Sequence, residues 1–375
     1  MGDMSQRHLW LAAPLALAAA LGVWAWTQSA SATALELPNR LSSGEFWALS
    51  ERFSEPGGYF RSDNLVSNEL TFQHVIPELK RVVTPGGVYF GVGPDQNFTY
   101  IAALRPKMAF ITDIRRDNLL LHLMYKALFE LSDDRADFLS RLVSRPRPSG
   151  LDEATDAGSL FAAYAGVRPD RELFERTLEA IAERLTGHHG FPLSSADLAA
   201  IEHVLGNFYG SGPGLSYSSR GGFSARRYPS YEDLQIATDA EGTPHAYMAS
   251  EDAFRAVRTL QRNNLLVPVV GDFGGPKALR AIGRYVRDRG AVIGAFYTSN
   301  VEQYLFQERA WFAFAENVAT MPVDESSTFI RSCFNQCATS FGSRSVTLLD
   351  SIPGLMRDVA DGRITSYWAV LNHSR

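Results

Sequence analysis

One stretch, residues 85 to 113, constrains the fold of this chain more than any other: PGGVYFGVGPDQNFTYIAALRPKMAFITD. An apolar run over 87–90 ends in a glycine-rich turn, and a helix-like stretch follows. A second apolar run, 108–112, then ends at Asp113, twenty residues beyond Gly93. Strand, turn, helix, strand and a terminal carboxylate, in this order, predict a Rossmann-like βαβ unit whose carboxylate accepts hydrogen bonds from ribose hydroxyls.

The glycine-rich turn indicates which class of nucleotide the βαβ unit could bind. Gly91 and Gly93 are followed by Pro94, Asp95 and Gln96, so the third glycine of G-x-G-x-x-G is missing. Since that glycine permits the close helix packing a dinucleotide site needs, the pattern argues against a classical NAD site. A nucleoside without a pyrophosphate, S-adenosylmethionine above all, needs only the tight turn and the acidic residue. An ordinary strand-to-helix turn is the alternative.

The alternation of strand and helix resumes near residue 245. It predicts an α/β fold, Rossmann-like and doubly wound, with a mostly parallel sheet, a helical insertion and final strands that are antiparallel. A helix is expected over 250–261. The further strands that the apolar runs predict are 245–249, 265–270, 291–297, 318–323, 345–349 and 364–370.

Composition shifts divide the chain into five segments. Residues 1–34 read as a signal peptide or membrane anchor, and 35–84 as a helical lead-in. The first half of the Rossmann-like domain is expected over 85–132, and its second half over 244–375. Between them, 133–243 holds helical patterns without a strand-like run, and it includes the Gly- and Ser-rich stretch 210–222, predicted to be a lid or a disordered loop.

The first segment also predicts a location. Residues 9–26 are an unbroken apolar stretch behind Arg7, followed by small residues that offer two A-x-A cleavage signals. This pattern is typical of a secretory signal peptide. The stretch is also close to the minimum length for an uncleaved membrane span, and both interpretations put the folded body on the far side of the membrane. The chain is therefore expected to be periplasmic or secreted, or anchored to the inner membrane.

Composition excludes several functions. A formal net charge of -5 and a pI of about 5.9 argue against a dedicated nucleic-acid binder. The chain contains no P-loop, no G-x-S-x-G and no H-E-x-x-H motif. The pair His188 and His189 reads as a solvated turn, and no metal site is expected. Cys333 and Cys337, four residues apart on an assumed helix, are expected not to form a disulfide.

Polar residues that follow the predicted strands mark a pocket. They are Asp95, Asp113, Asp272 and Asn300, with Glu302 just beyond. Parallel strands end at one edge of a sheet, where α/β proteins bind their ligands. A small-molecule ligand is therefore expected at this edge, and each of these side chains is also a candidate helix cap.

The arrangement resembles a class I S-adenosylmethionine-dependent methyltransferase. The resemblance implies that Gly91, Gly93 and Asp95 hold the amino-acid part of the cofactor and that Asp113 holds the ribose. It also implies that Glu251, or the adjacent Asp252, lies near the adenine, as a residue after a third strand. The loop after a fourth strand, which faces the methyl group in that family, would be 272–275.

Three segments of the sequence are also similar to those of a widespread set of uncharacterised bacterial proteins: GGYFRSDN, GVGPDQNFTYIAALRPKMAFITDIRR and VPVVGDFGGPKA. Two positions depart from the methyltransferase pattern. Gly91 stands where an acidic residue is usual, and Asp95 stands where a second glycine is usual.

Three functions remain open at this point. In a methyltransferase, Asp272 or Asn300 would orient the nucleophile, with little chemistry beyond positioning. A different enzyme on the same scaffold would place an anionic substrate at the helix N-terminus over 274–277. A non-catalytic exported binding protein would use the same pocket, with tyrosines supplying contact area. Export conflicts with the first function, because S-adenosylmethionine is a cytosolic metabolite.

Overall fold

Over the residues that the structure describes, six strands form a single sheet. The computed structural model describes residues 35–217, 228–334, 337 and 345–374. The strands are β1 Val88–Gly91, β2 Met108–Asp113, β3 Leu266–Val270, β4 Ile293–Ser299, β5 Thr328–Phe334 and β6 Ser345–Ser351. Their order across the sheet is β3-β2-β1-β4-β5-β6, and all neighbours are parallel except β5 and β6. The predicted α/β fold with a mostly parallel sheet is confirmed.

Helices occupy most of the remaining described chain. Those before and within the predicted insertion are α2 Ser43–Phe53, η1 Phe72–Val75, α3 Ile76–Val82, α4 Gln96–Leu104, α5 Arg116–Leu131, α6 Arg135–Val143, α7 Ala157–Ala165, α8 Arg171–Ala182, the π-helix η2 Glu183–His188, α9 Ser195–Ser211, η3 Gly212–Gly214 and α10 Tyr231–Ile236. Those that follow are α11 Glu251–Arg262, α12 Ala278–Arg287, α13 Val301–Gln307, α14 Trp311–Ala319, α15 Ile352–Ala360 and α16 Tyr367–His373.

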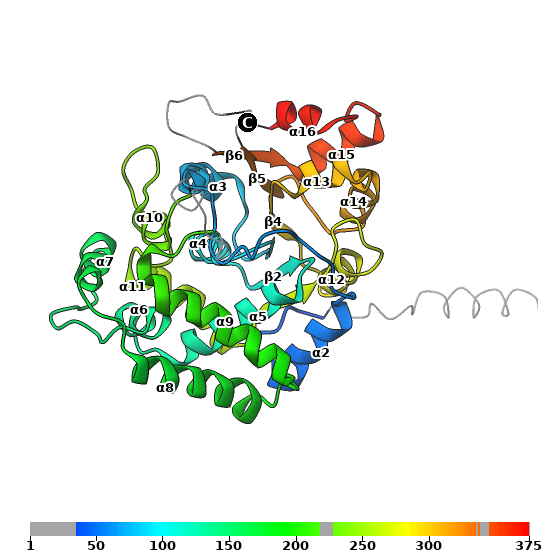
Figure 1. Cartoon of the computed structure of the whole chain (residues 1–375). Helices are drawn as coiled ribbons and strands as arrows, with labels where there is room; N and C mark the ends of the chain where they lie inside the picture. Colours follow the sequence, from blue (N-terminus) through cyan, green and yellow to red (C-terminus); the bar gives the residue numbers. More distant parts are fainter. Residues whose placement is uncertain (1–34, 218–227, 335–336, 338–344, 375) are drawn as a thin grey trace, which may run out of the picture. The chain divides into compact units, whose positions relative to one another are not determined.

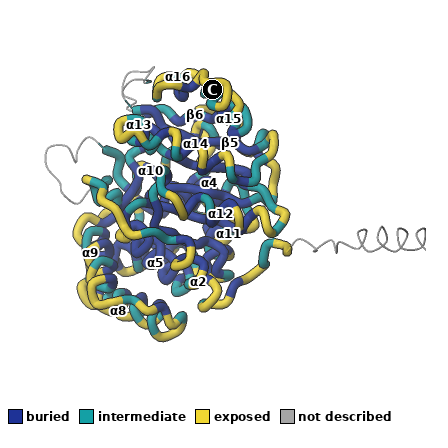
Figure 2. The backbone as a smooth tube through the Cα atoms, turned by 90° about the vertical axis from the view of Figure 1, so that its right-hand side faces the viewer, coloured by how far each residue is buried: buried dark blue, intermediate teal, exposed yellow. Residues whose placement is uncertain are grey.

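The sheet lies between helical layers. Figure 1 shows α4 on one side of the strands and α12 and α14 on the other. Strands β1, β2 and β3 are buried along their whole length, as expected for parallel strands covered on both faces. Figure 2 shows the buried chain concentrated around α4, α5 and α12, while α8 is mostly exposed. The predicted insertion is helical where it is described, and residues 36–375 form one compact unit.

Three predicted strands are wrong. Residues 245–249 form a turn before α11, and their run is apolar because Tyr247 and Met248 are fully buried there. Residues 318–323 contain the end of α14 and a turn. Residues 364–370 lead into α16, because the Ser366 side chain accepts a hydrogen bond from the backbone N–H of Ala369 and thereby caps a helix.

Strand β5 was not predicted, because its sequence TFIRSCF carries a charged residue at its centre. Arg331 is fully buried, where it donates to Glu302 at 2.8 and 3.0 Å and to Asp350 at 2.5 Å. Partnering by two carboxylates is what allows an arginine to be buried. The expectation for the cysteines is also wrong. Cys333 lies in β5 and not on the assumed helix, and it forms a disulfide with Cys337, with the two Cα atoms 5.8 Å apart.

The expected signal peptide or anchor, 1–34, lies outside the described residues, as do 218–222 of the predicted lid. Within the described residues, no helix combines the length and the apolar character that crossing a membrane requires.

Candidate functional site

A cavity of about 1180 Å³ lies at the carboxyl ends of the parallel strands. Its floor comes from the segments that follow β1, β2, β3 and β4. The chain reverses direction across the sheet between β1 and β4, and such a switch point is where open α/β sheets bind ligands. Further parts of the walls come from residues 59–71 before β1 and from residues 216–217 and 228–238 of the predicted insertion.

Four of the seven predicted site residues line this cavity: Gly93, Asp113, Asp272 and Asn300. They lie at the carboxyl ends of four different strands, so the sheet brings together residues more than two hundred positions apart in sequence. The other three, Gly91, Asp95 and Glu251, are not among its lining residues.

The turn after β1 is built around two glycines with different roles. Gly93 has a φ of +77°, a left-handed conformation that favours glycine, and lines the cavity. The His122 ring contacts the Gly93 carbonyl through Nε2 at 2.8 Å, and burial lowers the pKa of His122 to about 4. The ring is therefore neutral at pH 7, and Nε2–H donates to that carbonyl. At Gly91 a side chain would collide with the Asn97 amide oxygen, so this glycine permits close packing of α4 on β1.

Asp113 is the last residue of β2, and Arg115 links it by hydrogen bonds to residues 62–63 of the loop before β1. Its Oδ1 accepts from the Arg115 backbone N–H at 2.9 Å and from Arg115 Nε at 3.2 Å. The same guanidinium donates to the carbonyls of Ser62 and Asp63 at 2.9 and 2.6 Å. Because a carboxylate has about four acceptor positions, Asp113 keeps capacity for a ligand hydroxyl.

The N-terminus of α12, where an anionic substrate was expected to bind, is occupied by the carboxylate of Glu55. Glu55 accepts through Oε1 from the backbone N–H groups of Lys277 and Ala278, at 2.6 and 2.7 Å. Its Oε2 accepts from the Asp272 N–H at 3.2 Å, and Lys277 Nζ donates to the Ser54 carbonyl at 2.6 Å. The carboxylate therefore satisfies the start of α12 in the way an external anion would.

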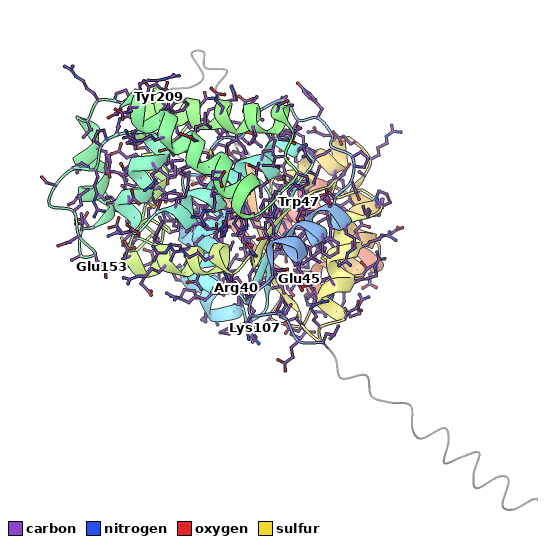
Figure 3. The ribbon with its side chains drawn as sticks, turned by 90° about the horizontal axis from the view of Figure 1, so that it is seen from below. Arg40, Glu45, Trp47, Lys107, Glu153 and Tyr209 are labelled. Carbon is purple, nitrogen blue, oxygen red and sulfur yellow. A yellow bond between two sulfur atoms is a disulfide. The ribbon has the colours of Figure 1, made fainter. Side chains whose placement is uncertain are left out.

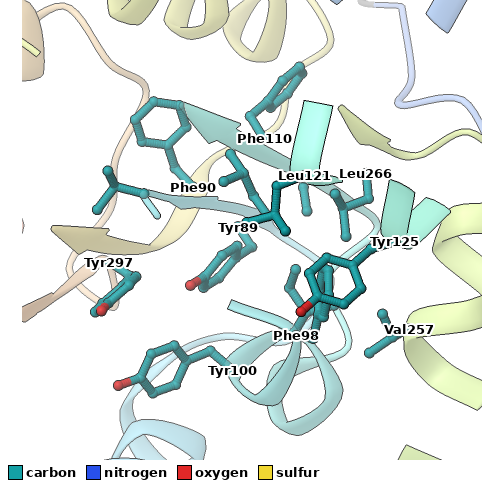
Figure 4. Packing of buried hydrophobic residues seen from close by; sticks show 14 of the residues in the cluster. Tyr89, Phe90, Phe98, Tyr100, Phe110, Leu121, Tyr125, Val257, Leu266 and Tyr297 are labelled. Carbon is teal, nitrogen blue, oxygen red and sulfur yellow. The ribbon is translucent and has the colours of Figure 1, made fainter. Parts of the chain in front are cut away.

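A buried carboxylate that sequence reasoning missed, Glu69, lies in the cavity wall. It accepts from Tyr297 Oη at 2.8 Å, from Ser299 Oγ at 2.5 Å and from Gln96 Nε2 at 2.7 Å. Ser299 has a φ of +52°, a conformation that costs free energy in a non-glycine residue and recurs at functional sites. Figure 4 shows Tyr297 and the neighbouring Tyr100 with their hydroxyl ends toward the same side.

The charge of the lining is predominantly negative. Among the described residues, five carboxylates line the cavity, against one arginine, Arg61, and one histidine, His74. The five are Glu69, Asp113, Asp233, Asp272 and Glu308. Aromatic residues also line the cavity, among them Phe60, Tyr217, Tyr228, Phe273 and Tyr304. Acidic groups beside ring faces favour a ligand that carries positive charge together with a flat or hydroxylated part.

Asp95 lies beneath the turn, without access to the cavity. Its Oδ2 accepts from Gln235 Nε2 at 3.1 Å, while its Oδ1 has no partner within the described residues. Burial raises the pKa of Asp95 to about 7. Glu251 is also occupied elsewhere, because it accepts from buried Arg135 at 3.2 Å at the start of α11. Over the part of the chain that the structure describes, no group of three His, Cys, Asp or Glu side chains is placed to hold a metal ion.

Comparison with known families gives one match. The model of a domain of unknown function, DUF7790, matches residues 64–186 and 223–348, about two thirds of the chain. The chain belongs to this family. Comparison with curated proteins finds no significant match.

The DUF7790 match contains Glu69, Asp113, Asp272 and Asn300, and it therefore spans the cavity floor from β1 to β4. It begins after Glu55, so the residue that caps α12 precedes the matched part. Glu69 could not be recognised from the sequence, because it belongs to no strand end and no motif. The available signal was the polar segment 61–69, which holds SDN and SNE beside aromatic residues.

Proposed function

We propose that the cavity binds S-adenosylmethionine and that the protein is a methyltransferase. The observation that carries the proposal is a polar residue at the carboxyl end of each of three parallel strands around one cavity: Asp113 ends β2, Asp272 follows β3 and Asn300 follows β4. S-adenosylmethionine carries a sulfonium and an ammonium group, which suit a lining with five carboxylates.

The strand assignments revise the roles suggested by the methyltransferase resemblance. Since β3 is residues 266–270, Asp272 takes the position near the adenine that the resemblance assigned to Glu251. Asn300 follows β4 and takes the position that faces the methyl group. Gly93 would hold the amino-acid part and Asp113 the ribose. Methyl transfer then needs mainly alignment of an acceptor with the sulfonium, which Asn300 and the neighbouring Glu69 would provide.

The test is thermal unfolding of residues 35–375 with S-adenosylmethionine and with S-adenosylhomocysteine. A ligand at 100 times its dissociation constant adds about 2.7 kcal/mol to the free energy of unfolding, which appears as an upward shift of several degrees. Asp113→Asn should weaken binding about 10- to 100-fold, because a hydrogen bond to a charged acceptor contributes about 1.5–3 kcal/mol.

Glu172→Gln is the matched control, since Glu172 is exposed on α8 and pairs only with Arg176 among the described residues. This control variant should bind as the wild type does. Absence of any shift with either ligand, in a protein that melts cooperatively, would contradict the proposal.

A non-catalytic exported binding protein is the second candidate, and the disulfide between Cys333 and Cys337 favours it. Disulfides persist in oxidising compartments, which agrees with export of the folded body. The discriminating measurement is thiol alkylation of the full chain in cells, with and without prior reduction. Cysteines that react only after reduction would support a periplasmic location, whereas free cysteines would place the protein where S-adenosylmethionine is made.

A further inference from the structure

A serine, a histidine and a glutamate form a hydrogen-bonded chain away from the cavity. Ser43 Oγ lies 2.7 Å from His189 Nδ1, and His189 Nε2 lies 2.7 Å from Glu130 Oε2. The three residues come from α2, from the turn after the π-helix η2, and from α5. None of them lines the cavity described above.

The donors and acceptors of this chain follow from its carboxylate. Burial opposes ionisation of Glu130, but hydrogen bonds from His189 and Lys126 lower the pKa of its carboxyl below the usual value. Lys126 Nζ donates to Glu130 Oε1 at 2.7 Å. An ionised carboxylate only accepts, so the His189 ring donates to it from Nε2–H. In the tautomer that carries its one proton on Nε2, Nδ1 is the acceptor, and the Ser43 hydroxyl donates to it.

The surroundings hold the imidazole in place. The Phe191 ring stacks on the His189 ring with centroids 4.9 Å apart and an interplanar angle of 10°, and it also stacks on Trp47, one turn after Ser43. Figure 3 shows Trp47 labelled on α2. A π-helix such as η2, which ends at His188, is rare and frequently marks a functional site.

Ser43 also stands at the start of a helix. It is the first residue of α2, behind the N-cap Ser42. The first N–H groups of a helix have no partner within it, and those of Ser43 and Gly44 have no hydrogen-bond acceptor within the described residues. Gly44 is exposed, and a Cβ built on it meets nothing within 4 Å. Two such N–H groups beside a nucleophile can stabilise an oxyanion.

We propose that Ser43, His189 and Glu130 form a second site that hydrolyses carboxylic esters with small acyl groups. The Ser43 oxygen attacks the ester carbonyl carbon while His189 Nδ1 takes the hydroxyl proton, and the tetrahedral oxyanion accepts from the N–H groups of Ser43 and Gly44. Its collapse breaks the bond to the leaving alkoxide, which takes the proton from Nδ1 and departs as the alcohol.

Water then attacks the acyl-serine ester, and Nδ1 takes the water proton. Collapse of the second tetrahedral species returns that proton to Ser43 and releases the carboxylic acid. Glu130 is a positioning residue, because it fixes the tautomer and stabilises the imidazolium without contacting the ester. Relative to the hydrolases in which Nε2 faces the serine, the two ring nitrogens exchange roles, and the proton balance is unchanged.

The test uses a fluorophosphonate probe on the full chain, followed by mass spectrometry of the labelled peptide. The expected result is covalent modification of Ser43, a step in which the serine oxygen displaces fluoride from phosphorus. His189→Gln should slow labelling at least about 100-fold, because a general base contributes about 10²–10⁴ in rate. Ser42→Ala is the matched control, and it should still be labelled at Ser43.

Two results would overturn the proposal: folded wild-type protein that remains unlabelled at Ser43, or labelling of the His189→Gln variant at the wild-type rate. Because the first result needs no variant, a failure of the substituted proteins to fold cannot obscure the answer. For Glu130→Gln, a changed pH profile of labelling would show that the carboxylate acts through His189. An unchanged profile in a folded variant would limit Glu130 to a structural role and contradict the assigned chain.

Discussion

Replacing Asp95 by asparagine should change how stability depends on pH. Asp95 is 1% exposed, and burial raises the pKa of its carboxyl from 3.8 to about 7. Between these two values the native state binds a proton that the unfolded chain has already released. The free energy of unfolding therefore falls as pH rises through this window, and the loss is complete above pH 7.

The magnitude follows from the two pKa values. A difference of about three pKa units corresponds to roughly 4 kcal/mol in total, of which about 2.5 kcal/mol falls between about pH 5 and pH 8. Asparagine does not ionise, so the free energy of unfolding of the variant lacks this pH dependence. The difference in unfolding free energy, variant minus wild type, should therefore increase by about 2.5 kcal/mol from pH 5 to pH 8. Any fixed cost of the amide cancels between the two pH values.

The assay is urea unfolding of both proteins at pH 5 and pH 8. His122, whose pKa is lowered to about 4, contributes the opposite trend, since stability rises with pH between about 4 and 6.5, but it does so equally in both proteins. A difference between the two proteins that changes by less than about 1 kcal/mol from pH 5 to pH 8 would refute the reasoning, because Asp95 would then titrate normally in the native state.

Three further substitutions test local packing and helix capping in the fold. Gly91→Ala should destabilise the protein by about 1–3 kcal/mol, because the methyl group collides with Asn97, as urea unfolding would show. Gly206→Ala, within α9 where a Cβ meets nothing within 4 Å, should instead stabilise it by about 0.5–1 kcal/mol in the same assay. Glu55→Ala should lower the melting midpoint, because the N–H groups at the start of α12 lose their carboxylate acceptor. Added sulfate should then raise the melting midpoint of the variant more than that of the wild type. An equal increase in both proteins would contradict the role of Glu55 as an internal anion.

The sequence predicted the sheet where strands are uniformly apolar and failed where burial depends on distant partners. Strands β1 to β4 are continuous buried runs, and periodicity alone identified them. Strand β5 was missed because Arg331 is compatible with a core only when Glu302 and Asp350 are beside it. Such pairing joins residues from three elements, and no local pattern contains that information.

The site residues also divide into those that the sequence predicted and those that it did not. Asp113, Asp272 and Asn300 follow strands, so topology places them at one edge of the sheet. Glu69 lies in the cavity wall, where it accepts hydrogen bonds from residues of β4 and α4. Glu251 lies outside the expected site, because its helix precedes β3. Both outcomes depend on how the chain crosses between strands, which apolar periodicity does not reveal.

The contacts of Glu55 bear on where a folding fragment of this chain must begin. The family match begins at residue 64, yet the start of α12 depends on Glu55, and the Glu55 N–H donates to the carbonyl of Val270 in β3 at 2.8 Å. Ser50 Oγ donates to the Pro268 carbonyl of the same strand at 2.6 Å. A fragment cut at residue 64 would therefore leave edge strand β3 and the first turn of α12 without these partners, so the folding unit extends upstream of the matched domain.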